Sequence, residues 1–170
     1  WEGLRGETVR GDCWDFLQPH GLAVGGEALS AFAKSCGLDS PQGKDPLTAV
    51  RDLNTALYAA FDYETGVTGA DSPIDHALSE GRGVCQDFAH IMIALCRGWG
   101  VPARYVSGYL YHKGSRDRSA ANATHAWVEA YLPSLGWVGF DPTNNIMACE
   151  RHIRAAVGRD YADVAPARGT

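Results

Sequence analysis

Apolar residues recur three or four positions apart over one stretch in the middle of the chain, which places them on one face of a helix. They are Leu47, Val50, Leu53, Leu57 and Phe61. We expect this helix to begin after Asp45, because its carboxylate can accept hydrogen bonds from the first turn and Pro46 is favoured at the first helical position. A second, short helix is expected to open at Ser72 and Pro73 and to end at Gly81.

A further apolar stripe follows the glycine-rich turn Gly81-Arg82-Gly83. Its members are Phe88, Ile91, Met92, Leu95 and Trp99, and Gly100 and Pro102 bound it. Their spacing is helical. Cys85 is therefore expected to lie at the start of this helix, directly after the turn.

Beyond this helix, three segments bounded by proline or glycine are rich in β-branched and aromatic residues, and each is expected to be a strand. They are Ala103 to Tyr111, Thr124 to Leu132 and Trp137 to Phe140. The turn-like sequence Pro133 to Gly136 should fold the second and third strands into a hairpin. The polar stretch Lys113 to Asn122 is expected to be a mobile loop. Helices followed by strands indicate an α+β fold with an antiparallel sheet, because alternating units would instead favour a parallel one.

The N-terminal quarter has weaker patterns. Its first 26 residues are rich in glycine and lack sustained periodicity, so they are expected to be irregular and to lead into a helix near Glu27 to Cys36. With 170 residues the chain fits one domain, of which we take residues 1–44 to be an N-terminal extension. The sequence begins with Trp1 and has no evident termination signal, so we expect it to be an excised part of a longer protein.

Composition excludes several classes of protein. An apolar share of 45% with 21% charged residues is typical of a globular protein, and no segment approaches the roughly 20 apolar residues of a membrane span. The net charge of −5 comes without a Lys/Arg cluster that could neutralise phosphates, so nucleic acid is not an expected partner. The five cysteines are odd in number and lack paired spacing, which argues against a disulfide framework and a zinc ribbon. We therefore expect a reducing compartment, the cytoplasm.

Three residues could form a nucleophilic site. A helix N-terminus favours a thiolate and also offers free backbone N–H groups to a developing oxyanion, so Cys85 is a candidate nucleophile. Such a thiol needs a base and a group that orients the base. His125 and Asp141 lie at comparable distances on either side of the predicted hairpin turn, so they should be near neighbours across its two strands.

Taken singly, each of these residues has an ordinary structural explanation. A lone cysteine before an apolar helix is more often part of the core, and a lone histidine on a strand is more often a satisfied polar residue. Asp141 precedes Pro142, where an aspartate commonly caps its own turn. The catalytic hypothesis therefore depends on the three residues together.

Longer motifs around these residues resemble the bacterial transglutaminase-like superfamily. They are Gly81 to His90 (GRGVCQDFAH), Gly100 to Tyr109 (GVPARYVSGY), Thr124 to Glu129 (THAWVE), Gly136 to Asn144 (GWVGFDPTN), His152-Ile153 and Gly158 to Val164 (GRDYADV). The resemblance covers roughly Pro46 to Arg168. It implies a papain-like, transglutaminase-like core in which the nucleophile helix packs on an antiparallel sheet.

The resemblance also implies roles. Cys85 would be the nucleophile, His125 the general base and acid, and Asp141 the residue that orients the imidazole. The family's chemistry is acyl transfer from an amide of a peptide or protein, and we expect hydrolysis, as by a peptidase or amidase, in preference to crosslinking by a second amine. Tyr63, Gln86 and Trp127 are further candidates for oxyanion or substrate contacts.

Alternatives and cofactors complete the sequence-based hypothesis. A non-catalytic peptide-binding domain would keep the fold but lose a triad residue, and arylamine N-acetyltransfer would need a basic site for coenzyme A phosphates. No two histidines have the spacing of a metal-ligand pair on a helix or hairpin, and no EF-hand or acidic calcium loop occurs, so no metal or other cofactor is expected. The sequence does not indicate an oligomeric state.

Overall fold

A computed structural model describes residues 1–41, 43–69, 72–112, 117–119 and 123–165. In chain order, the helices are α1 (Glu2–Arg5), α2 (Glu7–Asp12), η1 (Trp14–Phe16), α3 (Glu27–Ser35), α4 (Pro46–Ala60), α5 (Ile74–Glu80), α6 (Cys85–Gly98) and η2 (Tyr161–Val164). The strands are β1 (Asp62–Tyr63), β2 (Arg82–Gly83), β3 (Ala103–Leu110), β4 (His125–Leu132), β5 (Gly136–Asp141), β6 (Ile146–Met147) and β7 (His152–Gly158).

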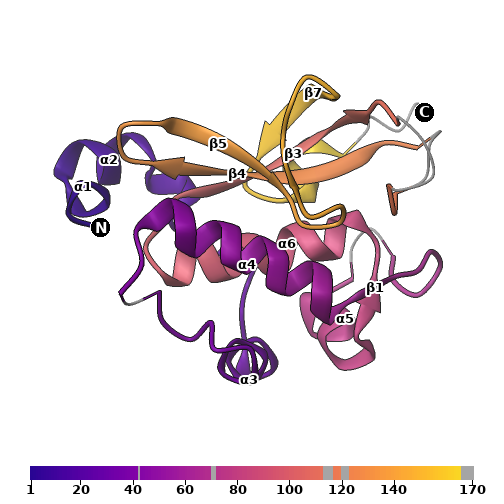
Figure 1. Cartoon of the computed structure of the whole chain (residues 1–170). Coiled ribbons are helices and arrows are strands. Elements are labelled where there is room, and N and C mark those ends of the chain that lie inside the picture. The colour runs from indigo at the N-terminus through magenta and orange to yellow at the C-terminus, as the bar shows by residue number, and fades with distance from the viewer. Residues whose placement is uncertain (42, 70–71, 113–116, 120–122, 166–170) are drawn as a thin grey trace.

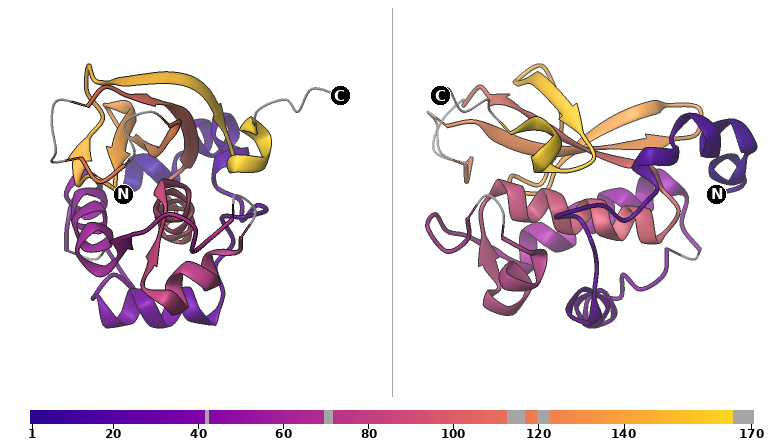
Figure 2. Two further views of the ribbon diagram at one scale, coloured as in Figure 1. Left: turned by 90° about the vertical axis from the view of Figure 1, so that its right-hand side faces the viewer. Right: turned by 180° about the vertical axis from the view of Figure 1, so that it is seen from behind.

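Five strands form one antiparallel sheet in the order β6-β5-β4-β3-β7. Helices α4 and α6 lie side by side beneath one face of this sheet, and α3 and α5 lie on the far side of these helices from the sheet (Figures 1 and 2). The core between the layers joins the apolar face of α6 to the inward residues of β3 and β4. Ile91, Met92, Tyr105 and Val128 are among its fully enclosed members.

The predicted α+β class is confirmed, and so are its principal elements. Helix α4 begins at Pro46, and the backbone N–H of Thr48 donates to the Asp45 carboxylate over 3.0 Å. Helix α6 begins at Cys85 as predicted, and α5 ends at Glu80 before Gly81, whose positive φ of 66° a glycine adopts readily. Strands β4 and β5 form the expected hairpin.

Two expectations at the ends of the chain were wrong or incomplete. The first 26 residues are not wholly irregular, because they contain α1, α2 and η1. Strand β7 was not predicted, although it pairs with β3 along the edge of the sheet. Of the loop Lys113 to Asn122, expected to be mobile, only residues 117–119 lie within the described part.

The N-terminal segment is joined to the core by Arg97, a buried residue near the end of α6. Its guanidinium donates to the carbonyl oxygens of Phe16 (3.1 Å) and Gln18 (3.1 Å). The same group also donates to the carbonyls of Ala103 (2.9 Å) and Arg159 (2.7 Å). One side chain thus connects the end of α6 to the N-terminal segment, to the start of β3 and to the chain between β7 and η2.

Candidate active site

Cys85 is the first residue of α6, and the short strand β2 leads into it. Only 8% of the residue is exposed. Val84 before it has extended backbone angles, φ −108° and ψ 175°, so the chain enters the helix at a sharp corner. The thiol therefore stands at the N-terminal end of α6, a largely buried helix of the core, where the helix dipole is positive.

Asp87 organises this helix end. Its Oδ2 accepts hydrogen bonds from the backbone N–H of Val84 (2.8 Å) and from the Thr68 hydroxyl (2.5 Å). The carboxylate lies so close to the preceding turn that a Cβ on Gly83 would be 2.6 Å from Oδ2, which explains the glycine there. Burial raises the pKa of Asp87, against the effect of these hydrogen bonds.

The first four backbone N–H groups of α6 fall into two pairs, of which one is hydrogen-bonded within the chain. Those of Asp87 and Phe88 donate to the carbonyl of Val84. Those of Cys85 and Gln86 have no acceptor among the described residues. Two free donors beside a thiol are the arrangement that stabilises a carbonyl oxygen as it gains negative charge.

His125 and Asp141 come together across the β4–β5 hairpin. In its register Val128 lies opposite Phe140, which sets His125 and Asp141 two positions apart on the same face. The separation from His125 Nε2 to Asp141 Oδ2 is 2.8 Å, and both side chains are almost fully buried. The contact expected from the hairpin is therefore present in the fold.

Asp141 is surrounded by hydrogen-bond donors. Oδ1 accepts from the backbone N–H groups of Thr143 (3.1 Å) and Asn144 (3.2 Å), and Oδ2 accepts from the Asn144 side chain (2.8 Å). Burial alone would raise the pKa of Asp141, but the hydrogen bonds from His125, His152 and Asn144 outweigh it and hold the pKa well below its usual range. The carboxylate is consequently ionised at neutral pH.

At His125, burial and hydrogen bonding change the pKa in the opposite directions to those at Asp141. Burial lowers its pKa, yet the hydrogen bond to Asp141 and the proximity of Cys85 overcome this effect and raise the pKa to about 10. Nε2 faces Asp141, so Nδ1 is the nitrogen available to the thiol. Nδ1 is buried and has no hydrogen bond of good geometry with any described residue. The imidazole is thus oriented and charged by Asp141 on one side and free to exchange a proton on the other.

A family model for the transglutaminase-like superfamily matches residues 31–142. The chain belongs to this superfamily. ML0607 of Mycobacterium leprae is 37% identical over 99% of this chain and 59% of its own length. Rv2569c of Mycobacterium tuberculosis is 42% identical over 74% of this chain and 43% of its own length. The chain therefore spans about half the length of these curated relatives.

Solved structures agree with this membership. A candidate cysteine protease from Cytophaga hutchinsonii superposes with a TM-score of 0.76 at 30% identity, over 94% of this chain and 52% of the other. The periplasmic domain of TgpA from Pseudomonas aeruginosa has a TM-score of 0.55 at 29% identity, over 79% of this chain and 49% of its own. The expected transglutaminase-like core is thus confirmed, and the superfamily is generally enzymatic.

The remaining candidate residues of this transglutaminase-like domain lie at different depths. Tyr63 is half-buried on β1 and pairs with Gly83 in the parallel β1–β2 ladder, two residues before Cys85. Gln86 is half-buried in the first turn of α6. Trp127 is buried, with its ring 6.2 Å from that of His125. Its indole N–H has no partner among the described residues. Tyr63 therefore lies on the strand beside the turn that leads to Cys85, Gln86 follows Cys85 in α6, and Trp127 packs against the imidazole.

Sequence analysis named His152 within a motif but did not assign it to the site, where its Nε2 lies 3.2 Å from Asp141 Oδ2. Spacing along the chain gave no sign that two histidines would share one carboxylate, because β7 reaches the site through its pairing with β3. Ligand-type atoms of His125, Asp141 and His152 lie within 4.8 Å of one another, so this group could also hold a metal ion. Hydrogen bonds account for the arrangement without one.

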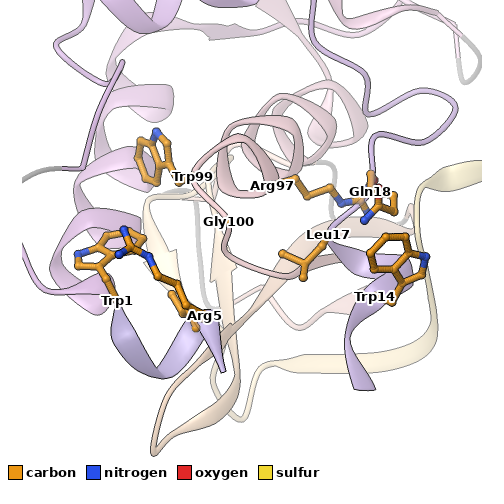
Figure 3. Close-up of a pocket in the computed structure, with 9 residues that line it drawn as sticks. Trp1, Arg5, Trp14, Leu17, Gln18, Arg97, Trp99 and Gly100 are labelled. Atoms are coloured by element: carbon orange, nitrogen blue, oxygen red, sulfur yellow. The ribbon is translucent and has the colours of Figure 1, made fainter. Parts of the chain in front are cut away.

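Three surface hollows lie elsewhere in the domain. One of about 310 Å³ is lined by Trp1, Arg5, Trp14 and Trp99 at the C-terminal end of α6, opposite the end that begins with Cys85 (Figure 3). One neighbouring hollow shares Leu17 and Arg97 with it, and another shares Trp1, Arg5 and Trp99. None of the three includes a residue of the Cys85 site.

No helix in the described part of the chain is long and apolar enough to cross a membrane.

Proposed function

We propose that this domain catalyses acyl transfer from amide bonds of peptides or proteins, with Cys85 as nucleophile, His125 as general base and acid, and Asp141 as the group that orients His125. One observation carries the proposal. The thiol stands at a helix N-terminus beside a buried imidazole, whose far nitrogen lies 2.8 Å from an ionised carboxylate. A nucleophile, a base and an orienting group in this order are what thiol acyl transfer requires.

The reaction would proceed in two stages. The Cys85 sulfur attacks the amide carbon, and the oxygen gains negative charge near the free N–H groups of Cys85 and Gln86. The C–N bond then breaks as His125 delivers a proton to the leaving amine, which gives a thioester on Cys85. In the second stage His125 removes a proton from the incoming water or amine, the C–S bond breaks, and the acid or new amide leaves.

We propose hydrolysis as the principal outcome. Water reaches any open site at far higher concentration than an amine, and crosslinking requires a site shape that excludes it. The printed names of similar proteins include both activities. One is a candidate cysteine protease. Another, 34% identical over 51% of this chain and 14% of its own length, is a protein-glutamine gamma-glutamyltransferase from Pseudomonas aeruginosa. Crosslinking is therefore the second candidate.

The test is a product analysis by mass spectrometry. The protein is incubated with a peptide library that contains glutamine, with and without a primary amine such as a labelled cadaverine. Cut peptides, or glutamate in place of glutamine, indicate hydrolysis, whereas amine adducts indicate crosslinking. Cys85→Ala should abolish every product, and Cys36→Ala is the matched control because Cys36 is an exposed thiol outside the site. Turnover by Cys85→Ala would refute the proposal, and peptide binding without any turnover by the natural protein would favour a non-catalytic domain.

Two further proposals concern organisation and compartment. We propose that residues 1–170 act as one domain, since Leu4, Ala23 and Leu29 of the N-terminal segment join the same core as α6. We also propose a cytoplasmic location. The five cysteines are free thiols, the state that the cytoplasm maintains. Cell fractionation with the TgpA domain as a periplasmic marker tests the second proposal.

A further inference from the structure

Two histidines share one oxygen of Asp141. His152, the first residue of β7, has its Nε2 3.2 Å from Asp141 Oδ2, the oxygen that lies 2.8 Å from His125 Nε2. Its side chain is only 2% exposed. Since β7 pairs with β3 and not with the hairpin that bears the other two residues, His152 approaches the carboxylate from a separate part of the sheet.

The hydrogen bonds of His152 define where its proton lies. The backbone N–H of Cys149 donates to His152 Nδ1 over 3.2 Å, so in the neutral ring Nδ1 carries the lone pair. The proton is then on Nε2 and points to Asp141. A return bond from the His152 N–H to the Cys149 carbonyl, 2.9 Å, closes this turn. The Trp127 ring, edge-on at 5.1 Å, limits rotation of the imidazole.

We propose that His152 is a positioning residue, whose Nε2–H holds the Asp141 carboxylate in the orientation that His125 requires; this inference rests on the proposed triad. Asp141 needs such support because its side chain can otherwise rotate about its own turn. The backbone of Thr143 and Asn144 fixes Oδ1. Oδ2 must serve His125, and its position is set by donors on either side, His152 and the Asn144 amide.

This support acts on the reactive nitrogen at a distance. If Oδ2 shifts, the hydrogen bond that orients the His125 ring weakens, and Nδ1 no longer faces the thiol at the correct angle. His152 itself would touch neither substrate nor sulfur. Its loss should therefore lower the rate of the chemical step and leave substrate binding nearly unchanged.

Three variants separate this role from simple packing. His152→Phe fills the space but removes the donor, whereas His152→Gln retains a side-chain N–H that can reach Asp141. Ile153→Thr, next along β7 and exposed, is the matched control. We expect His152→Phe to lower kcat and the alkylation rate of Cys85 by about tenfold or more with KM changed less than about twofold, and His152→Gln to recover most of both losses.

Two results would overturn the inference. One is wild-type kcat and Cys85 alkylation in His152→Phe, and the other is equal impairment of the Phe and Gln variants. Alkylation needs no substrate, so these tests remain valid if the proposed reaction is wrong, and that failure shows itself separately as turnover by Cys85→Ala. Nitrogen-15 NMR of the unmodified protein at pH 7 measures the tautomer of His152 directly, so this test does not depend on whether a variant folds. A neutral His152 protonated on Nε2 supports the proposal, and one protonated on Nδ1 contradicts it.

Discussion

Asp141 Oδ2 and His125 Nε2 lie 2.8 Å apart although neither residue pairs directly with the other in the hairpin. The register leaves them two positions out of step, at the open end of β4 and β5 away from the turn. Their side chains meet there, close to Cys85 at the start of α6. The pair is buried, and it joins an ionised carboxylate to an imidazole of raised pKa. The contact therefore affects both the stability of the fold and the chemistry of the site.

The pair should make stability depend on pH in two directions. The pKa of Asp141 is lower in the folded chain than in the unfolded one, so its contribution is present above about pH 4 and is lost as pH falls. The pKa of His125 is raised to about 10, so its contribution is full below about pH 6.5 and is lost as the pH rises through 10. Stability from this pair is therefore greatest between these limits.

Asp141→Asn tests this dependence. At pH 6 the variant should unfold with a free energy about 3 kcal/mol lower than the natural protein, because a buried charge loses its partner. At pH 10.5 the difference should shrink, since His125 is then neutral in both. The control is Asp52→Asn, which removes the exposed partner of Lys44 and should cost less than about 1 kcal/mol at either pH. Urea denaturation at both pH values measures these differences, and an Asp141→Asn deficit independent of pH would contradict the assignment.

Thiol labelling should single out Cys85. We expect iodoacetamide to modify Cys85 between pH 6 and 7 faster than the exposed Cys36 and Cys149, because a helix N-terminus and an imidazolium favour the thiolate. Cys96 should stay unlabelled, since burial raises its pKa to about 12. Mass spectrometry of each cysteine at a series of pH values measures the rates.

His125→Ala is the companion variant for this measurement. It should slow the labelling of Cys85 at pH 6 to 7 while leaving that of Cys36 unchanged, because only Cys85 loses an imidazolium neighbour. Equal rates for Cys85 and Cys36 in the natural protein, or no effect of His125→Ala, would argue against an activated nucleophile.

Features that depend on local sequence were predictable. The helices at Pro46 and Cys85 follow from apolar spacing and from a cap or a glycine turn. The meeting of His125 and Asp141 follows from a single hairpin, whose turn lies midway between them. The predicted contact needed no long-range information, and for this reason the sequence located it.

Features that depend on long-range pairing were not predictable. Strand β7 is an edge strand whose exposed residues break the alternation of apolar and polar positions, and its pairing with β3 contains a register shift. His152 could not be placed at the site without that pairing. Helices α1 and α2 have only four and six residues, too short for periodicity to show. Local sequence also gave no sign that the Asp87 carboxylate accepts a hydrogen bond from Thr68, 19 positions earlier.

Asp87 should be necessary for the N-terminal end of α6. Asp87→Ala removes the acceptor for the Val84 N–H and should lower the free energy of unfolding by about 1 to 2 kcal/mol. It should also slow Cys85 labelling, because the turn that holds the thiol in place loses the hydrogen bond from the Val84 N–H. Asp75→Ala is the control, as Asp75 lies exposed in the first turn of α5 and should change stability by less than about 0.5 kcal/mol. Equal stability of the two variants would refute the capping role.

Arg97 should determine stability without influencing the reaction. A lysine has three donors on a flexible stem and cannot reproduce the guanidinium fork that donates to the carbonyls of four residues, so Arg97→Lys should lower the free energy of unfolding by about 3 kcal/mol. Arg159→Lys is the control, because its partner Asp163 is near the surface and the change should cost less than about 1 kcal/mol.

Hydrogen exchange and labelling complete the Arg97 test. Amides near residues 16–18 should exchange faster in Arg97→Lys, since that segment loses its connection to α6. Arg97 and Cys85 are twelve residues apart on one helix, about 18 Å at 1.5 Å per residue, so Cys85 should be alkylated at the natural rate. Stability equal to that of Arg159→Lys would show that the carbonyl contacts contribute little. A loss of Cys85 labelling in the folded variant would mean that the two ends of α6 are coupled, contrary to their separate roles here.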